Sequence, residues 1–284
     1  GQFQEEYVKM IPEIYWAGRR YNQKTYPLIP FGHFNQEYKV NGQVYKQPDS
    51  WEQTLDTRQA VVSCRNTYGD ALNVETDVFI HLNYDMVVIK KRFYTKAPGT
   101  SSVKAAFNYQ FTPPGYENSL PERVKSKCQW NDKTQSIEYR YEADSYKPGK
   151  GIISVFSDQK ITPVIDGQSV SLVSEIGLDA NNPSEITYYL LFSDTMDGED
   201  YLERQTNMQE YIRDSGYTKI LATHIAEWAQ YWDDSFVNLP DEQMEKAYNT
   251  AQYNLRTIAT KWSFPIGISP RLWSGRYFAF DESF

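Results

Sequence analysis

Apolar and polar residues alternate with a period of two along much of the first 196 residues, a pattern typical of half-buried β-strands. In the clearest segment the apolar positions are Leu72, Val74, Val78, Ile80 and Leu82. The polar positions between them include Asn73, Glu75, Asp77 and His81. Because successive side chains of a strand point to opposite faces, we expect the apolar set to enter one core and the polar set to face solvent.

Strand-like segments flank this one at residues 58–68 and 86–94, so the three segments predict an antiparallel meander. Further strand candidates lie at residues 103–111, 136–141, 152–156 and 186–192. Loops rich in proline and glycine separate them, and no helical period precedes residue 198. Many strands followed by a purely helical run predict a mainly β chain, with a large antiparallel β super-sandwich over residues 1–196.

From about residue 198 the apolar period becomes helical. Gly216 is predicted to end a first helix as its C-terminal cap. A second helix carries the aromatic stripe Trp228, Tyr231 and Trp232, which we expect to be buried where the helices meet the β domain. Pro240–Asp241 is predicted to open a third helix over residues 241–262. Its expected buried face consists of Met244, Ala247, Tyr248, Ala251, Leu255, Ile258, Ala259 and Trp262.

Composition limits the classes of function. A net charge of -8 argues against a general binder of nucleic acid or anionic membranes, because both need basic patches. No stretch approaches the roughly 18 apolar residues of a membrane span. Aromatic residues make up 15% of the chain, which tyrosine-rich strands explain and which stacking on sugar rings would also use.

The two cysteines, Cys64 and Cys128, have no metal-ligand spacing, and we expect two free thiols rather than a disulfide. The chain opens with Gly1–Gln2–Phe3 instead of methionine, which is typical of a protein exported to the periplasm or the extracellular space after loss of a signal segment. Its close on Asp281–Phe284, in which paired carboxylates, a serine and an aromatic residue end the chain with no polar tail, leads us to expect a truncated chain.

Few residues suggest chemistry. His224 lies on the apolar stripe of the second helix, where a core role is the simplest interpretation. The sequence contains no glycine-rich phosphate loop and no HExxH or GxSxG motif, so we expect neither a cofactor nor a metal. Asp281 and Glu282 are adjacent and would diverge, so they cannot by themselves form the facing acid and base of a glycosidase.

The chain resembles the N-terminal half of family 65-like glycoside hydrolases and phosphorylases. Four features carry the resemblance: the long-stranded β domain, the helical pattern His224-x-x-x-Trp228-x-x-x-Trp232, the helix at 241–262 and the closing segment SPRLWSGRYFAFDESF. Members of that family join a super-sandwich to an (α/α)6 barrel. The resemblance therefore implies a β super-sandwich at 1–196, a helical linker at 197–237 and the start of a truncated barrel at 238–284.

The family motif G-H-x-F-W-D-T-E contains an Asp that contacts the sugar at the point of bond cleavage. Residues 275–283 stand in its place, with Asp281 matching the sugar-binding Asp, Phe280 the Trp and Arg276 roughly the His. Ser283 stands where the family has Glu. The substrate-binding residues that the resemblance implies are Trp273, Arg276, Phe280, Asp281 and Glu282. No catalytic residue is assigned, because the general acid of the family is a Glu further along the barrel.

We therefore expect the N-terminal portion of a secreted glycoside hydrolase that acts on oligosaccharides without a cofactor. Its β domain would support the barrel of the same polypeptide, and the chain alone would be inactive. One alternative is a self-contained carbohydrate-binding β-sandwich whose C-terminal helices pack on its own sheet. A bare apolar stripe on helix 241–262 would argue against that alternative. Another is a mutarotase-like enzyme, which needs a His and a carboxylate converging on the concave sheet.

Overall fold

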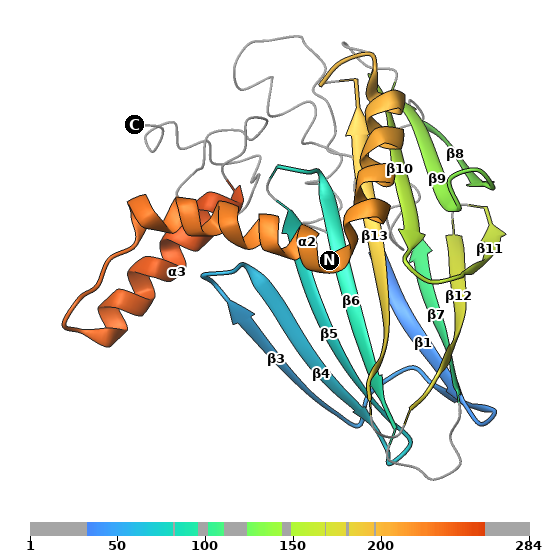
Figure 1. Cartoon of the computed structure of the whole chain (residues 1–284), viewed down its shortest axis with the longest axis horizontal. Helices are drawn as coiled ribbons and strands as arrows, with labels where there is room; N and C mark the ends of the chain where they lie inside the picture. The colour runs from blue at the N-terminus through green and yellow to red at the C-terminus, as the bar shows by residue number, and fades with distance from the viewer. Residues whose placement is uncertain are drawn as a thin grey trace, which may run out of the picture. The chain divides into compact units, whose positions relative to one another are not determined.

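The computed structural model describes residues 33–81, 83–95, 102–110, 124–143, 149–167, 169–179, 182–195 and 197–258. Their Cα positions divide the described chain into two compact units. One unit holds residues 33–56 and 60–227, and the other holds residues 57–59 and 228–258. Two antiparallel sheets make up most of the first unit, as the super-sandwich prediction requires (Figure 1).

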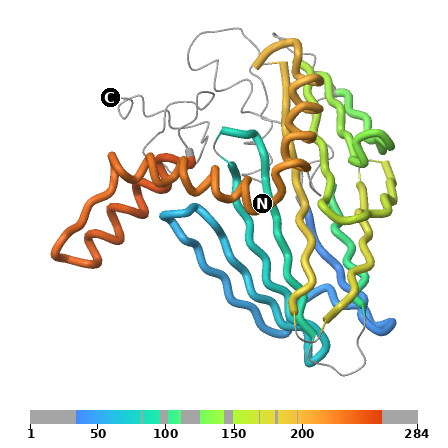
Figure 2. Tube along the Cα trace, in the orientation of Figure 1, coloured from blue at the N-terminus to red at the C-terminus, as the bar shows by residue number. Residues whose placement is uncertain are grey.

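The smaller sheet has five strands in the order β11-β12-β7-β1-β2. These strands are β1 (His33–Val40), β2 (Gln43–Tyr45), β7 (Ser102–Gln110), β11 (Thr162–Asp166) and β12 (Ser169–Gly177). The larger sheet has eight strands in the order β3-β4-β5-β6-β13-β10-β9-β8. These strands are β3 (Ser50–Asp56), β4 (Val61–Tyr68), β5 (Leu72–His81), β6 (Met86–Tyr94), β8 (Val124–Asn131), β9 (Ser136–Ala143), β10 (Gly149–Ser157) and β13 (Ser184–Asp194). Strands β4 to β6 form the expected meander, and β3 extends it by one strand (Figure 2).

A hydrophobic core fills the space between the two sheets. Strand β7 contributes every second side chain to it, and these four are Val103, Ala105, Phe107 and Tyr109. Across the core, the ring of Phe107 stacks on Tyr188 of β13 with centroids 4.6 Å apart. The period of two in the sequence therefore reports burial correctly where only one face of a strand is covered.

A second core covers the opposite face of the eight-stranded sheet. There Ile212 and Ile220 of helix α2 (Tyr201–Ser235) pack on side chains of the sheet. The sheet side chains of this core are Phe79, Met86, Val88, Phe156, Tyr189 and Leu191. Because both faces are covered at the centre of the sheet, residues 186–191 of β13 form a continuous buried run instead of an alternating one.

Strand β5 corrects one prediction. Leu72 and Val74 are buried between the sheets as expected, but Ile80 is 65% exposed and His81 only 2% exposed. The pairing with β6 continues without a bulge from Val78 to Ile80, so Ile80 keeps the face of Val78. Beyond Val78 that face loses its cover, whereas the opposite face, with His81, is buried beneath α2. Leu82 lies outside the described residues.

The helices begin and break where the sequence indicates. Gly216 has φ 69° and ψ 171° and interrupts the helical backbone inside α2, in a region that glycine adopts without steric cost. Helix α3 (Glu242–Ile258) is capped by Asp241, whose Oδ1 accepts hydrogen bonds from the backbone N–H of Gln243 and Met244. Neither described helix is long and apolar enough to cross a membrane. Both cysteines are free thiols, as predicted.

A lysine side chain lies inside the sandwich. Lys91 of β6 is 3% exposed, and its Nζ donates hydrogen bonds to the Tyr38 hydroxyl at 2.9 Å and to Thr76 Oγ1 at 2.8 Å. Tyr38 belongs to the other sheet, so Lys91 joins the two layers through neutral partners. Burial lowers the pKa of Lys91 from 10.5 to about 7, and the nearby Cys64 opposes this shift.

This lowered pKa makes stability depend on pH. Between about pH 7 and pH 10.5 the unfolded chain holds a proton on Lys91 that the folded chain releases, so stability rises with pH in this window and falls as pH drops toward 7. The slope approaches about 1.4 kcal/mol per pH unit. We expect Lys91→Met to flatten the free energy of unfolding between pH 7 and pH 9, measured by urea denaturation. The exposed Lys104→Met should keep the wild-type profile, and equal slopes in all three proteins would contradict a neutral buried amine.

Candidate functional site

A polar cluster surrounds His81 at the end of β5. The Thr223 hydroxyl lies 3.1 Å from His81 Nε2 and itself donates to the carbonyl of Ile220, so it accepts a hydrogen bond from Nε2–H. The Nδ1 atom accepts from the backbone N–H groups of Asn83 at 3.3 Å and Tyr84 at 3.4 Å. These partners fix the neutral tautomer of His81 that carries its proton on Nε2.

Burial, and then the neighbouring His224, lower the pKa of His81 from 6.5 to about 4. At neutral pH the imidazole is therefore uncharged, and the 3.5 Å approach of Glu227 Oε2 to His81 Nδ1 is not an ion pair. His224 is fully buried and stacks on Phe79 with centroids 4.5 Å apart. The expectation that His224 is a core residue is confirmed.

A histidine and a carboxylate thus converge, as a mutarotase-like site would need. They do so on the face of the sheet that α2 covers, where the His81 side chain is 0% exposed and His224 is 0% exposed. A general base must come within hydrogen-bond reach of its substrate, and no substrate reaches a ring enclosed in this way. We therefore interpret this cluster as structural: its hydrogen bonds and ring contacts hold α2 on the sheet.

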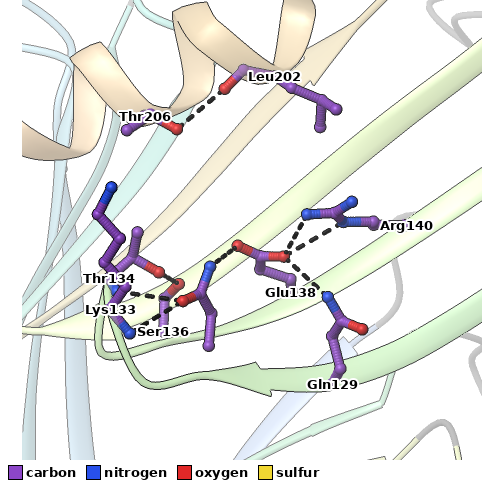
Figure 3. A network of polar contacts seen from close by, with 9 residues as sticks. Gln129, Lys133, Thr134, Ser136, Glu138, Arg140, Leu202 and Thr206 are labelled. Atoms are coloured by element: carbon purple, nitrogen blue, oxygen red, sulfur yellow. Dashed lines mark hydrogen bonds and ion pairs between the residues drawn. The ribbon is translucent and has the colours of Figure 1, made fainter.

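A buried carboxylate, that of Glu138 of β9, lies in the network shown in Figure 3. Its Oε2 accepts from Arg140 Nη2 at 2.9 Å and Arg140 Nε at 3.2 Å, and from Gln129 Nε2 at 3.2 Å. Its Oε1 accepts from Asn131 Nδ2 at 2.6 Å. Because the Arg140 guanidinium and two side-chain amides donate to its two oxygens, this carboxylate is satisfied by protein partners.

The described residues contain no candidate metal site, because no three His, Cys, Asp or Glu side chains among them lie close enough together to hold an ion. The buried titratable groups described above are instead held by protein partners. The functional surfaces of the described chain must therefore be sought among exposed side chains.

The second unit contains the packed end of α2. Trp228 is 1% exposed and stacks on Tyr253 of α3 with centroids 5.3 Å apart. Trp232 is also buried and donates from Nε1 to the Arg58 carbonyl at 3.1 Å, and Tyr231 donates from its hydroxyl to the Gln252 carbonyl at 3.0 Å. The expected burial of the aromatic stripe is confirmed for the two tryptophans, while Tyr231 is half-buried.

Helix α3 packs on α2 through Gln252 and Tyr253, and this orientation overturns one prediction. The described part of the apolar stripe that the sequence assigned to a buried face is exposed, with Met244 at 61%, Tyr248 at 41% and Leu255 at 44%. The predicted members Ala259 and Trp262 and the side chain of Ile258 lie outside the described residues. Ala247 and Ala251 lie on the same stripe and are also exposed. The helical period identified the apolar face correctly, but this face points away from α2 and remains bare.

The five residues predicted to bind substrate, which are Trp273, Arg276, Phe280, Asp281 and Glu282, lie outside the described residues. Their roles therefore remain predictions. The polar cluster around His81 had no signal in the sequence, because the alternation around His81 predicted a solvated side chain. Only the apolar stripe of α2 hinted that another layer covers this face of the sheet.

Comparisons with known proteins find similarity to two phosphorylases and a glucoamylase. No protein-family model matches the chain. Over 98 residues it is 29% identical to a nigerose phosphorylase of Lachnoclostridium phytofermentans, a region that covers 34% of this chain and 13% of that protein. A human-microbiome protein assigned as a kojibiose phosphorylase superimposes with a TM-score of 0.58 at 11% identity, covering 78% of this chain and 30% of that one.

A bacterial glucoamylase complexed with acarbose superimposes with a TM-score of 0.50 at 10% identity, covering 83% of this chain and 36% of that one. These likenesses confirm the resemblance to the N-terminal part of family 65-like enzymes, and for the two solved structures the likeness is one of fold. The chain spans about a third or less of the length of the proteins that it matches.

The neutral His81 predicts sensitivity to acid. Between about pH 6.5 and pH 4 the unfolded chain binds a proton on this residue that the folded chain excludes, so stability is lost as pH falls through this window. We expect His81→Gln to be less stable than wild type at pH 7, because the buried hydrogen bonds are disturbed, yet to lose less stability on going to pH 4.5. Urea denaturation at both pH values measures the difference.

The exposed Glu52→Gln serves as the control for His81→Gln and should follow the wild-type profile. An acid sensitivity of His81→Gln equal to that of wild type would show that His81 is not held neutral in the folded state.

Proposed function

We propose that this chain is the N-terminal portion of a glycoside-active enzyme, a family 65-like hydrolase or phosphorylase that acts on disaccharides or short oligosaccharides. The observation that carries the proposal is the sandwich and its helix, which follow an enzyme assigned as a kojibiose phosphorylase over 78% of this chain. The sequence likeness to a nigerose phosphorylase supports the same substrate class. As a hydrolase, the enzyme would use two-carboxylate chemistry and need no cofactor.

We further propose that the β domain and its helices support an α-helical barrel of the same polypeptide. The bare stripe of α3 supports this role, because a contiguous exposed apolar surface on a helix marks an interaction site. Its members recur every three or four residues, the spacing with which one helix packs on another. The proposed occupant of the stripe is therefore a helix of the barrel.

The alternative of a self-contained carbohydrate-binding sandwich would bury this stripe on its own sheet, so charges placed on the stripe would then lower the melting temperature of the isolated chain. The proposed linker at 197–237, the barrel start at 238–284 and the export of the protein stay predictions.

The stripe can be tested in the complete enzyme. The double substitution Met244→Lys with Leu255→Lys places two charges on the proposed interface, where they would be desolvated without partners. We expect kcat/KM to fall by at least about tenfold and the two parts of the protein to melt separately in calorimetry. The isolated 284-residue chain should keep its melting temperature, because both side chains are exposed in it.

The matched control is Gln243→Lys with Thr250→Lys, which adds the same charge at exposed polar positions of α3 outside the stripe. It should leave activity and melting unchanged. Equal changes in kcat/KM and in melting for the two double variants would show that the stripe is not part of the interface.

We also propose that Asp281 binds a sugar hydroxyl, with Trp273, Arg276, Phe280 and Glu282 around the same sugar. Loss of the charge-assisted bond in Asp281→Asn would cost about 1.5–3 kcal/mol. In the complete enzyme we expect kcat/KM to fall about ten- to hundredfold, with kcat included if the bond tightens in the transition state. An unchanged kcat/KM with a lowered Tm would assign Asp281 to helix capping.

A further inference from the structure

The outer face of the five-stranded sheet carries a hollow of about 290 Å³. Register places Asn35 of β1, Asn108 of β7 and Ser171 of β12 in one row across its floor, with Val164 of β11 at the end of the row. The next row toward the β11–β12 turn contributes Gln110, Ser169 and Asp166. The hollow is thus built from side chains of four adjacent strands within one unit.

The backbone beneath the hollow is well defined. Asp166 and Ser169 lie directly opposite each other at a tight turn, in which Gly167 has φ 58°, a left-handed conformation that favours glycine. On the opposite side of the same strands, Tyr109 and Val170 are buried in the core between the sheets. Polar groups that stand on a packed sheet are held close to one geometry before a ligand arrives.

The chemistry of the lining identifies a ligand class. Asn108 Nδ2 donates to Asn35 Oδ1 at 3.0 Å, and this hydrogen bond orients both amides. With Gln110 the hollow has three amides, each able to donate and accept. Ser169 and Ser171 add hydroxyls, and Asp166 adds a charged acceptor. This mixture complements a ligand whose hydroxyl groups also donate and accept.

Other ligand classes fit less well. The lining includes a carboxylate and neither Lys nor Arg, which opposes phosphate and other anions. The aromatic ring of the lining, that of Tyr109, is 2% exposed on the core side, so a nucleobase would find no stacking surface. A single carboxylate is a poor ligand set for Ca²⁺. Val164, 56% exposed, offers an apolar contact such as the C–H face of a sugar uses.

We propose that this hollow is a binding site for a neutral saccharide. Its volume is near the lower end of the roughly 300–1,000 Å³ of small-molecule sites, which suits one or two sugar units of a longer chain. The site uses only residues of β1, β7, β11 and β12 and is independent of the barrel and of Asp281. Binding here would hold an oligosaccharide on the β domain whatever reaction the complete enzyme performs.

The test is titration of the 284-residue chain with maltotriose, cellotriose, mannotriose, galactotriose and xylotriose by calorimetry and saturation-transfer NMR. We expect at least one trisaccharide to bind with a Kd of about 1 mM or tighter, and inorganic phosphate not to compete. Asn108→Ala and Asp166→Ala should each weaken binding by about fivefold or more, the loss of one or two hydrogen bonds. Lys104→Ala, on the same face of β7 but outside the hollow, should bind as wild type does.

Equal melting temperatures of the three variants would show that weakened binding is not unfolding. Failure of all five trisaccharides to bind, binding that Asn108→Ala and Asp166→Ala leave unchanged, or competition by phosphate would each overturn the proposal. The α3 stripe is tested in the complete enzyme, so none of these outcomes affects it. The saccharide site and the barrel contact can therefore be refuted independently of each other.

Discussion

The burial of both faces at the centre of the eight-stranded sheet is the constraint on which the rest of the first unit depends. One face is covered there by the five-stranded sheet and the other by α2, so β13 is buried on both sides over residues 186–191. Parallel sheets usually show this pattern, and here an antiparallel sheet acquires it from the helix. The position of α2 therefore decides which side chains at the margin of the sheet are buried.

The sequence could predict the sandwich because most strands have one covered face, and a period of two reports such a face directly. It could not predict the end of β5, where the covered face changes from that of Val78 to that of His81. Periodicity likewise identified the apolar face of α3 but not its partner, since the contact with α2 uses Gln252 and Tyr253. The period of apolar residues shows which face of a helix or strand is apolar. Which element packs on that face depends on the tertiary structure. The proposed sugar-contact residues could be named only through resemblance.

Three buried polar side chains show how the fold accommodates groups that water would otherwise solvate. Glu138 is held by the guanidinium of Arg140 and by two amides. Lys91 and His81 have neutral hydrogen-bond partners, and burial lowers the pKa of both. Removing a charge from water is costly, so these two side chains respond by losing the proton. Stability therefore depends on pH through His81 between about pH 4 and 6.5 and through Lys91 between about pH 7 and 10.5.

The enclosure of these titratable side chains also limits where the described chain can act. A general acid or base needs an ionisable group that a substrate can reach, and His81, His224 and Glu138 are enclosed by protein. Two exposed surfaces of the described chain carry the proposals: the apolar stripe on α3 and the polar hollow on the five-stranded sheet. These surfaces suit different partners. Burial of Met244 and Leu255 against an apolar surface is favourable, whereas Asn108 and Asp166 can form hydrogen bonds with a ligand rich in hydroxyls. On the two proposals made above, the stripe of α3 contacts the catalytic part and the hollow contacts a sugar, whereas the enclosed titratable groups stabilise the fold.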